Sequence, residues 1–189
     1  MSAGAAGGGL APLAVILAGG LSRRMGSPKA LVELGGRPLL AWPLAAALEA
    51  GLEAVVVAKP GSPLPPFDVA LWPEPEQPVH PLAGVIAALE RAGPRAVVVL
   101  ACDMPFVPAA LIARLAALDA VAAAPPGEAF PARYEPAALP VLRAGLEREA
   151  PLREVLAELG PVEVAAGDPH ALLGVNDPAA LARAAALLR

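Results

Sequence analysis

The sequence predicts a three-layer α/β fold, in which helices cover both faces of a mostly parallel, twisted sheet. Short continuous runs of apolar residues are typical of strands buried on both faces of such a sheet. Four runs of this kind occur, at residues 13–18, 54–58, 96–101 and 120–124. Segments with a helical pattern lie between them, at residues 39–50, 82–92 and 109–118. Strands that alternate with helices at this spacing indicate stacked βαβ units.

Composition favours one folded domain. The chain has 189 residues, of which 57% are apolar and 17% charged, and an apolar fraction this high excludes disorder for most of it. Residues 1–12 are mainly small and uncharged, so we expect a flexible tail there and a single domain at residues 13–189.

Charge and hydropathy exclude several classes of function. The first positive side chain is Arg23, and no uninterrupted apolar run reaches about 18 residues, so we expect a cytoplasmic protein without a membrane span. A net charge of -4 argues against nucleic acid, which usually needs a basic face. Polar side chains are scarce: the chain has no Thr, one Asn and only two Lys beside twelve Arg. Many Pro and Arg with few Asn and Gln are typical of heat-adapted proteins and equally of genomic base bias.

The remaining elements follow from prolines and caps. Residues 59–81 carry eight of the 24 prolines and predict a rigid extended connection around one short strand near 69–72. Further along we expect a strand at 129–135, helices at 137–149 and 152–159, a strand at 162–166 and a helix at 178–188. The last helix has Pro178 at its first position, with Asn176 or Asp177 as its cap.

The segment at residues 17–29, LAGGLSRRMGSPK, begins where the first predicted strand ends. Ligands of open α/β sheets bind beyond the carboxyl ends of strands. Gly19 and Gly20 allow the backbone to turn and direct amide groups at phosphate oxygens. Three positive charges follow without an acidic residue among them: Arg23, Arg24 and Lys29. The spacing fits neither the Walker A motif nor the dinucleotide motif GxGxxG.

A second segment, VVVLACDMPF at residues 97–106, places Asp103 just past a buried strand. Parallel strands present their carboxyl ends on one side, so Asp103 is expected on the same rim as Gly19. Magnesium takes one or two carboxylates together with phosphate oxygens and water, so one Asp is enough. The alternative is that Asp103 caps the helix that begins near Pro108.

Cys102 raises the question of a covalent mechanism, because a thiol nucleophile needs a base within reach. The chain contains only His80 and His170, and neither forms a recognisable Cys-His pattern. A buried small apolar residue is the better interpretation.

A third segment, PLAG at residues 81–84, opens a predicted helix. A helix N-terminus binds anions or base edges through its free amides. Pro followed by Gly is also ordinary at the start of a helix, so a structural role stays open.

Together these segments resemble the signature motifs of the molybdenum cofactor guanylyltransferase family: LAGGxSxRMGxDK followed by LxxxxGxPLL, CDxPF/Y and GPLAG. Two weaker matches are FPARY at residues 130–134 and GVNDP at residues 174–178, so the resemblance runs from about 13 to 188. It implies a Rossmann-like nucleotidyltransferase fold. It also implies transfer of GMP from Mg²⁺-bound GTP to the phosphate of molybdenum-molybdopterin, with release of pyrophosphate.

The resemblance implies roles for single residues. Lys29, Arg24 and Asp103 would be catalytic, and Asp103 would bind the metal. The implied nucleotide-binding residues are Leu17, Ala18, Gly19, Gly20, Lys29, Glu74, Pro81, Leu82, Gly84 and Asp103. Arg133 and Asn176 are assigned to the pterin side. Implied partners are GTP, molybdenum-molybdopterin, molybdopterin-loading proteins and apo-molybdoenzymes.

Some positions depart from the family pattern: Pro28 precedes Lys29, Ala58 stands where an Asn is usual, Pro73 replaces an Asp beside Glu74, and His80 replaces the Gly before PLAG. These changes affect base selection more than chemistry. Three alternatives therefore stay open: a related enzyme that uses CTP, a nucleotide-binding protein without turnover, and a delivery partner in molybdoenzyme maturation.

Overall fold

The computed structural model describes residues 10–19 and 27–189. Residues 1–9 of the predicted tail lie outside the described residues, as do Gly20 and Arg24 of the first motif. None of the helices in the part of the chain that is described has the length and apolar character needed to cross a membrane.

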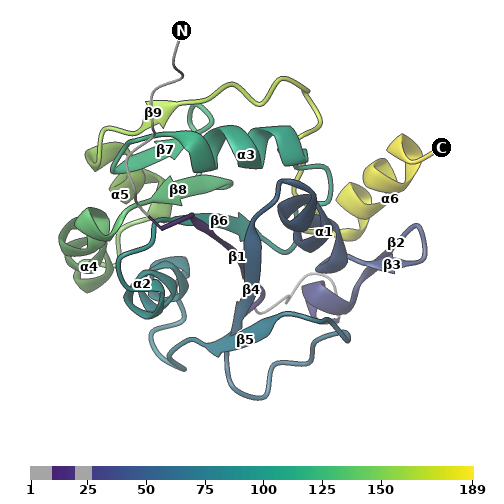
Figure 1. Ribbon diagram of the computed structural model, residues 1–189. Helices are drawn as coiled ribbons and strands as arrows, with labels where there is room; N and C mark the ends of the chain where they lie inside the picture. The colour runs from purple at the N-terminus through teal and green to yellow at the C-terminus, as the bar shows by residue number, and fades with distance from the viewer. Residues whose placement is uncertain (1–9, 20–26) are drawn as a thin grey trace, which may run out of the picture.

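A twisted sheet forms the centre of the molecule (Figure 1). Its strands are β1 (Leu13–Leu17), β4 (Glu53–Ala58), β5 (Ala70–Pro73), β6 (Val97–Ala101), β7 (Ala122–Ala124), β8 (Ala132–Tyr134) and β9 (Val162–Glu163). Among the described residues these seven strands have the order β5-β4-β1-β6-β8-β7-β9. β8 pairs antiparallel with β6 and β7, and the other pairs are parallel. The predicted mostly parallel sheet is confirmed.

Helices cover both faces of the sheet, as predicted (Figure 1). One layer contains α1 (Ala41–Glu49) and α3 (Ala109–Ala117); the other contains α2 (Pro81–Ala92), α4 (Leu139–Glu147) and α5 (Leu152–Glu158). Successive side chains of a strand point to opposite faces. In β1, Leu13 and Val15 therefore pack toward α2, whereas Ala14 and Ile16 pack toward α1 and α3. The strand is apolar throughout because both of its faces are buried.

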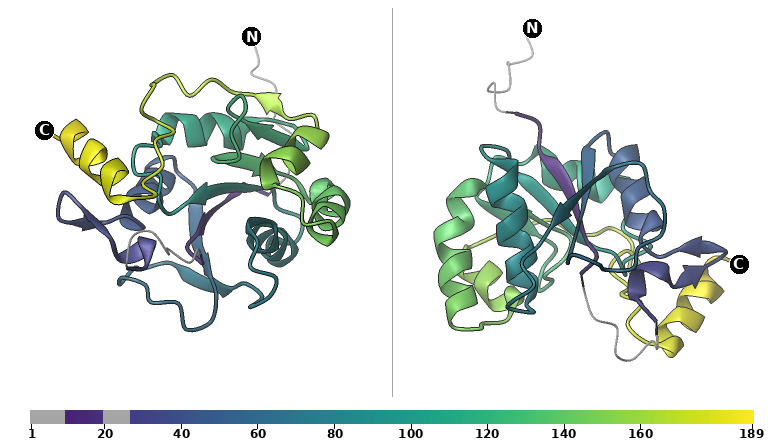
Figure 2. Two further views of the ribbon diagram at one scale, coloured as in Figure 1. Left: turned by 180° about the vertical axis from the view of Figure 1, so that it is seen from behind. Right: turned by 90° about the horizontal axis from the view of Figure 1, so that it is seen from below.

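A small flanking unit was not predicted. The short 3-10 helix Lys29–Leu31 leads into a hairpin of β2 (Glu33–Leu34) and β3 (Arg37–Pro38). Gly35 and Gly36 connect the two strands with φ of 59° and 76°, a conformation that favours glycine and suits a two-residue hairpin turn. The hairpin lies beside α6 (Pro178–Leu187) (Figures 1 and 2), and Leu34 and Ala184 share a third apolar cluster.

Prolines explain where predicted elements are shorter than expected. The strand expected at 129–135 is limited to Ala132–Tyr134, because Pro131 has no N–H to donate to a neighbour. The strand expected at 162–166 ends at Glu163, since its partner β7 ends before Pro125. The helix expected at 137–149 divides into a 3-10 turn at Pro136–Ala138 and α4.

Candidate active site

A pocket lies where four neighbouring parallel strands end. Glu74 follows β5, Lys59 follows β4, Gly19 follows β1 by two residues and Asp103 follows β6 by two residues. These residues surround a cavity of about 230 Å³. Its full lining is Leu17, Gly19, Lys29, Lys59, Glu74, Val79, His80, Pro81, Ala101, Cys102, Asp103 and Phe130. The sheet thus gathers charged side chains that are far apart in the sequence.

Lys29 and Asp103 form an ion pair at one side of this pocket. Lys29 Nζ donates to Asp103 Oδ2 at 2.6 Å and to Asn176 Oδ1 at 2.5 Å. The side chains of Lys29 and Asp103 are 21% and 14% exposed, so both are reachable from solvent and largely shielded. The first and second motifs therefore meet in space, together with the only Asn of the chain.

The capping interpretation of Asp103 is not supported. The residue before α3 is Pro108, and no side chain caps that helix. The α6 cap is Asp177, whose Oδ1 accepts from Ala180 N at 2.7 Å. Asn176 is therefore not the cap, and its carboxamide is directed to Lys29 instead.

Lys59 and Glu74 form a second ion pair, with 3.4 Å between Nζ and Oε1. Burial raises the pKa of Glu74, and the positive charge of Lys59 opposes that rise. The Glu74 carboxylate lies against two glycines: a Cβ on Gly19 would come within 2.2 Å of Oε1, and a Cβ on Gly84 within 2.7 Å of Oε2. Gly84 belongs to the PLAG segment, so its lack of a side chain makes room for this carboxylate.

The N-terminus of α2 closes another side of the pocket. Pro81 is its first residue, and His80 caps it by accepting a hydrogen bond from Leu82 N on Nδ1 at 3.2 Å. His80 and Pro81 both line the cavity. The start of the helix therefore lies at the cavity, although Pro81 has no N–H and the Leu82 N–H is bound by His80.

The surroundings of Cys102 are not those of a reactive thiol. Burial, reinforced by the Asp103 charge and only partly opposed by Lys29, raises the pKa of its thiol to about 12. A thiolate is the reactive form, so the protonated thiol behaves as a buried small residue.

Comparison with known proteins gives the family. Residues 14–164 match the family described as MobA-like NTP transferase domain. The chain belongs to this family.

Individual proteins similar to this chain carry names that fit this family. A molybdenum cofactor guanylyltransferase of Cereibacter sphaeroides is 38% identical over an alignment of 193 positions, which spans 93% of this chain and 96% of that protein. A protein of the same name from Rhodobacter capsulatus is 44% identical over 110 residues, covering 54% of this chain and 56% of that protein.

Solved structures share the fold. Molybdopterin-guanine dinucleotide biosynthesis protein A from Archaeoglobus fulgidus superposes with a TM-score of 0.74 at 24% identity, covering 93% of this chain and 98% of that one. The 2-C-methyl-D-erythritol 4-phosphate cytidylyltransferase of Thermus thermophilus superposes with a TM-score of 0.68 at 29% identity, with the same coverage of 93% and 98%. The predicted nucleotidyltransferase fold is confirmed.

Six of the thirteen residues predicted from the family motifs line the pocket. Those that line it are Leu17, Gly19, Lys29, Glu74, Pro81 and Asp103. Ala18, Leu82 and Gly84 are buried and do not line it. Ala18 and Leu82 pack into the apolar core, and Gly84 lies against the Glu74 carboxylate. Gly20 and Arg24 lie outside the described residues.

Arg133 is not brought to the pocket. Its side chain is 6% exposed, and its guanidinium donates to the carbonyls of Ala116 and Ala120 and to Glu135. These contacts join β8 to the end of α3. Its structural role replaces the predicted place on the pterin side.

Lys59 is the pocket residue that sequence reasoning missed. The signal was available, since the chain has only two lysines and Lys59 directly follows a predicted strand. Lys59 is also the first residue of the proline-rich connection, which carries no charge pattern of its own. Both lysines of the chain lie in the pocket.

Proposed function

We propose that this protein transfers GMP from GTP to the terminal phosphate of molybdenum-molybdopterin and releases pyrophosphate. An oxygen of the acceptor phosphate attacks the α-phosphorus, and the bond from that phosphorus to the bridging oxygen of the β-phosphate breaks. The proposal rests above all on the convergence of Lys29 and Asp103, 2.6 Å apart beside the carboxyl end of β1. The names of the full-length relatives support the same reaction.

The reaction needs no general base. A phosphate monoester has a second pKa near 6, so the attacking oxygen is already anionic at neutral pH. The barrier comes from bringing two polyanions together, which requires positive charge and alignment. Lys29 would supply that charge at the triphosphate, with the backbone of the Gly19 turn beside it. Arg24 is proposed for the same task from its motif.

A divalent metal fits the donor set when the nucleotide contributes to its coordination. Among the described residues no group of three or more His, Cys, Asp or Glu could enclose an ion. Mg²⁺ is commonly held by one or two carboxylates plus phosphate oxygens and water, and Asp103 offers one carboxylate at the pocket. Bound there, Mg²⁺ would neutralise charge on the α-phosphate.

Glu74 supports a guanine base. A carboxylate repels phosphate groups, so Glu74 would face the base or the ribose. Guanine presents adjacent N1–H and N2–H donors, which one carboxylate can accept together, whereas cytosine presents a single amino group. The pair of oxygens on Glu74 therefore favours GTP over CTP.

The acceptor substrate would approach from the side of Asn176, which touches Lys29. We propose that Asn176 holds the lysine between donor and acceptor phosphates. GTP is available in the cytoplasm, where we expect the reaction. Molybdopterin-loading proteins would supply its substrate, and apo-molybdoenzymes would receive its product.

Calorimetric titration with GTP, CTP, ATP and UTP, each with and without Mg²⁺, tests the donor. Binding of GTP that Mg²⁺ strengthens, together with formation of the dinucleotide from molybdenum-molybdopterin, is the expected result. A preference for CTP would move the protein to a cytidylyl reaction. Tight GTP binding without pyrophosphate release would leave a nucleotide-binding maturation partner.

A further inference from the structure

Lys59 lies in the pocket but in none of the motifs that predict the site. We propose that Lys59 is a positioning residue for base selection, which holds the Glu74 carboxylate and the backbone after it in the place where guanine binds. This inference rests on the proposed function, because it assigns Glu74 to the base.

Among the described residues, the polar contacts of Lys59 all lie on one short segment. Its Nζ donates to Pro75 O at 2.7 Å and to Glu76 O at 2.9 Å, and it lies 3.4 Å from Glu74 Oε1. An ammonium group has three donors and no acceptor. The three acceptors come from three consecutive residues, so the lysine is committed to this segment rather than to a phosphate.

The carbonyl oxygens of residues 75 and 76 accept hydrogen bonds from a side chain outside their own segment. Glu74 N donates to Ala58 O at 3.0 Å, which continues the contact between β5 and β4. Prolines at 73, 75 and 78 then remove backbone donors from the chain. Lys59 donates to the carbonyls of Pro75 and Glu76. Its side chain therefore holds the backbone just beyond the point where the hydrogen bonds between β4 and β5 end.

Glu74 has little room to move sideways. Its carboxylate lies between the backbones of Gly19 and Gly84, and its side chain is 10% exposed. The position of the Glu74 carboxylate is therefore set by the two glycines beside it and by its ion pair with Lys59. A fixed pair of acceptor oxygens discriminates best against a base that lacks a matching donor.

The charge of Lys59 has a second effect. Burial raises the pKa of Glu74 and Lys59 lowers it, so loss of the lysine would favour the protonated carboxyl, which accepts guanine donors less well. The other charged or titratable side chains that line the pocket, among the described residues, are Lys29, His80, Cys102 and Asp103.

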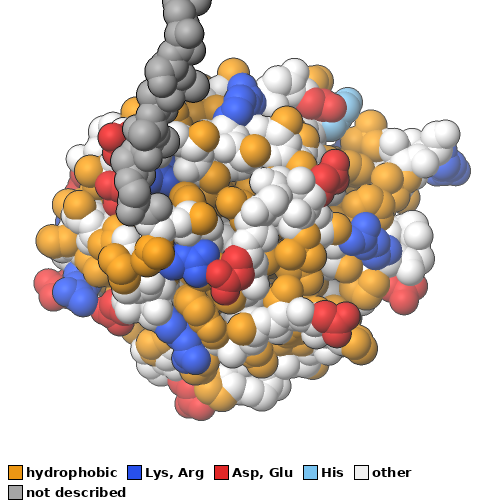
Figure 3. Space-filling view, viewed as in Figure 1, with side chains coloured by type: hydrophobic (Ala, Val, Ile, Leu, Met, Phe, Trp, Pro, Cys, Tyr) orange, Lys and Arg blue, Asp and Glu red, His pale blue; other side chains and the backbone are white. Residues whose placement is uncertain are grey.

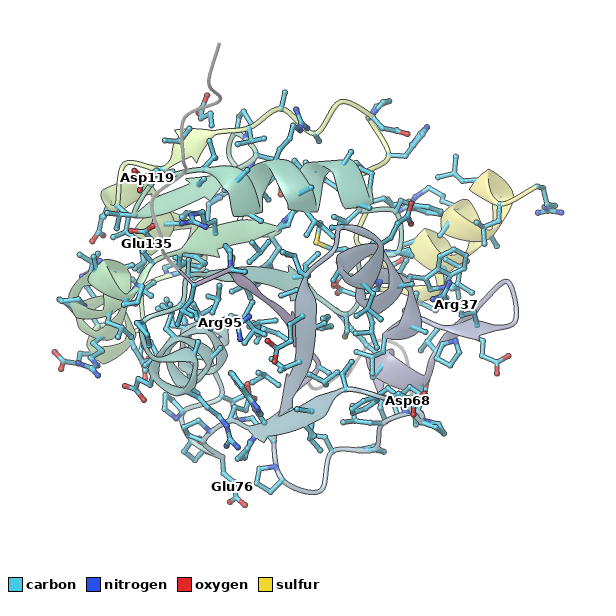
Figure 4. The ribbon with its side chains drawn as sticks, in the orientation of Figure 1. Arg37, Asp68, Glu76, Arg95, Asp119 and Glu135 are labelled. Carbon is cyan, nitrogen blue, oxygen red and sulfur yellow. The ribbon has the colours of Figure 1, made fainter. Side chains whose placement is uncertain are left out.

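Glu76 provides a matched control. Lys59 binds its carbonyl oxygen, while its exposed side chain points outward at the lower edge of the molecule in Figure 4. Glu76→Gln removes a carboxylate two residues from Glu74 and leaves the Lys59 contacts in place. It is expected to behave as the wild type.

The experiment measures affinity for GTP and for ITP, which lacks the 2-amino group of guanine, in the presence of Mg²⁺. The full chain is compared with Lys59→Met, Lys59→Arg and Glu76→Gln. In the wild type we expect GTP to bind about tenfold tighter than ITP, corresponding to one good contact. Lys59→Met should lose this preference while ITP affinity changes less than about threefold, because the triphosphate contacts remain.

The pH dependence separates charge from position. GTP affinity should fall as the pH drops through the raised pKa of Glu74. Lys59→Met should move that midpoint to higher pH, because the lowering charge is gone. Lys59→Arg keeps the positive charge and should keep the midpoint of the pH dependence. The planar guanidinium cannot donate to the same three acceptors in the same geometry, so the preference for GTP over ITP should fall. Glu74→Gln should remove the dependence.

The outcomes are distinct. A wild type without a preference for GTP over CTP or ATP contradicts the proposed function itself. A wild-type preference that survives in Lys59→Met with an unmoved midpoint overturns the role of Lys59 alone. If Lys59→Met does not fold, Lys59→Arg decides, and an unchanged GTP to ITP ratio in that variant overturns the inference.

Discussion

Lys29 Nζ lies 2.6 Å from Asp103 Oδ2, although 74 positions separate the two residues in the chain. Each is the counter-ion of the other, which allows both charges to sit in a pocket that is largely shielded from water. The pair joins the 3-10 helix Lys29–Leu31 to the segment that follows β6. Before substrate binds, the charges of Lys29 and Asp103 neutralise each other. The triphosphate would then pair with the lysine, and its metal with the carboxylate.

Asp103→Ala tests the metal role. We expect turnover to fall by about a thousandfold or more, because stabilisation of charge on the transferred phosphate is lost. The fold should remain, since Asp103 does not cap α3 and its backbone carbonyl still accepts from Val175 N at 2.8 Å. Pyrophosphate release and a thermal melt measure the two effects.

The control for that variant is Asp119→Ala. Asp119 is exposed in the loop between α3 and β7, at the upper left of the view in Figure 4, so its removal should change neither activity nor melting. A variant at position 103 that unfolds, or that keeps wild-type turnover, would remove the metal assignment.

Two adjacent residues should respond in opposite ways. Asn176→Ala removes a partner of Lys29 and should lower kcat by about tenfold with little change in melting, the scale of one lost polar contact. Asp177→Ala removes the cap of α6 and should cost about 1 kcal/mol of unfolding free energy, or about 2–4 °C in Tm. Equal effects of both variants on kcat would contradict the assigned roles.

Gly84→Ala should separate stability from nucleotide binding. Alanine in a helix is favoured over glycine by about 0.5–1 kcal/mol, whereas the added Cβ, 2.7 Å from Glu74 Oε2, would push this carboxylate out of the place that it has between Gly19 and Gly84. We expect an unchanged or higher Tm and a GTP KM raised by about tenfold.

Gly145→Ala serves as the comparison for the same change in another helix. Its Cβ would lie 2.4 Å from Val155 Cγ2 in the core, where the neighbour cannot move away. Overpacking of this kind costs about 1–3 kcal/mol, so Tm should fall while the GTP KM stays near wild type. A raised KM in both variants would mean that position 84 acts only through stability.

Cys102 should be inert in the folded protein. With a pKa raised to about 12, roughly one thiol in ten thousand is ionised at pH 8, so alkylation by iodoacetamide should be slow until the chain unfolds. Cys102→Ala should keep most of the turnover. Rapid alkylation that abolishes activity would reopen the covalent mechanism.

The sheet and its helices were predictable because they depend on local pattern. Runs such as residues 54–58 have no polar alternation, and this alone indicates a strand buried on both faces. The β2–β3 hairpin escaped prediction because each strand has only two residues. The signal for it in the sequence is the glycine pair at 35 and 36, which suits a two-residue hairpin turn.

The site was predictable where a residue directly follows a strand. Asp103 and Gly19 were found in this way, and the topology brings them together. Arg133 shows the limit of such reasoning, since its position in a motif carries no information about which way its side chain points. The tertiary contacts of α3 decide that, and they bury its guanidinium.

Charged side chains of both signs share one face of the molecule. On the face shown in Figure 3, basic and acidic side chains are interspersed among hydrophobic ones.

The segment around Asn176 lies outside the region matched to the family, residues 14–164, yet it reaches back to Lys29 and to the backbone of Asp103. During synthesis Gly19, Lys59 and Asp103 leave the ribosome before this segment does. Lys29 therefore gains its second partner only after nearly the whole chain has been made.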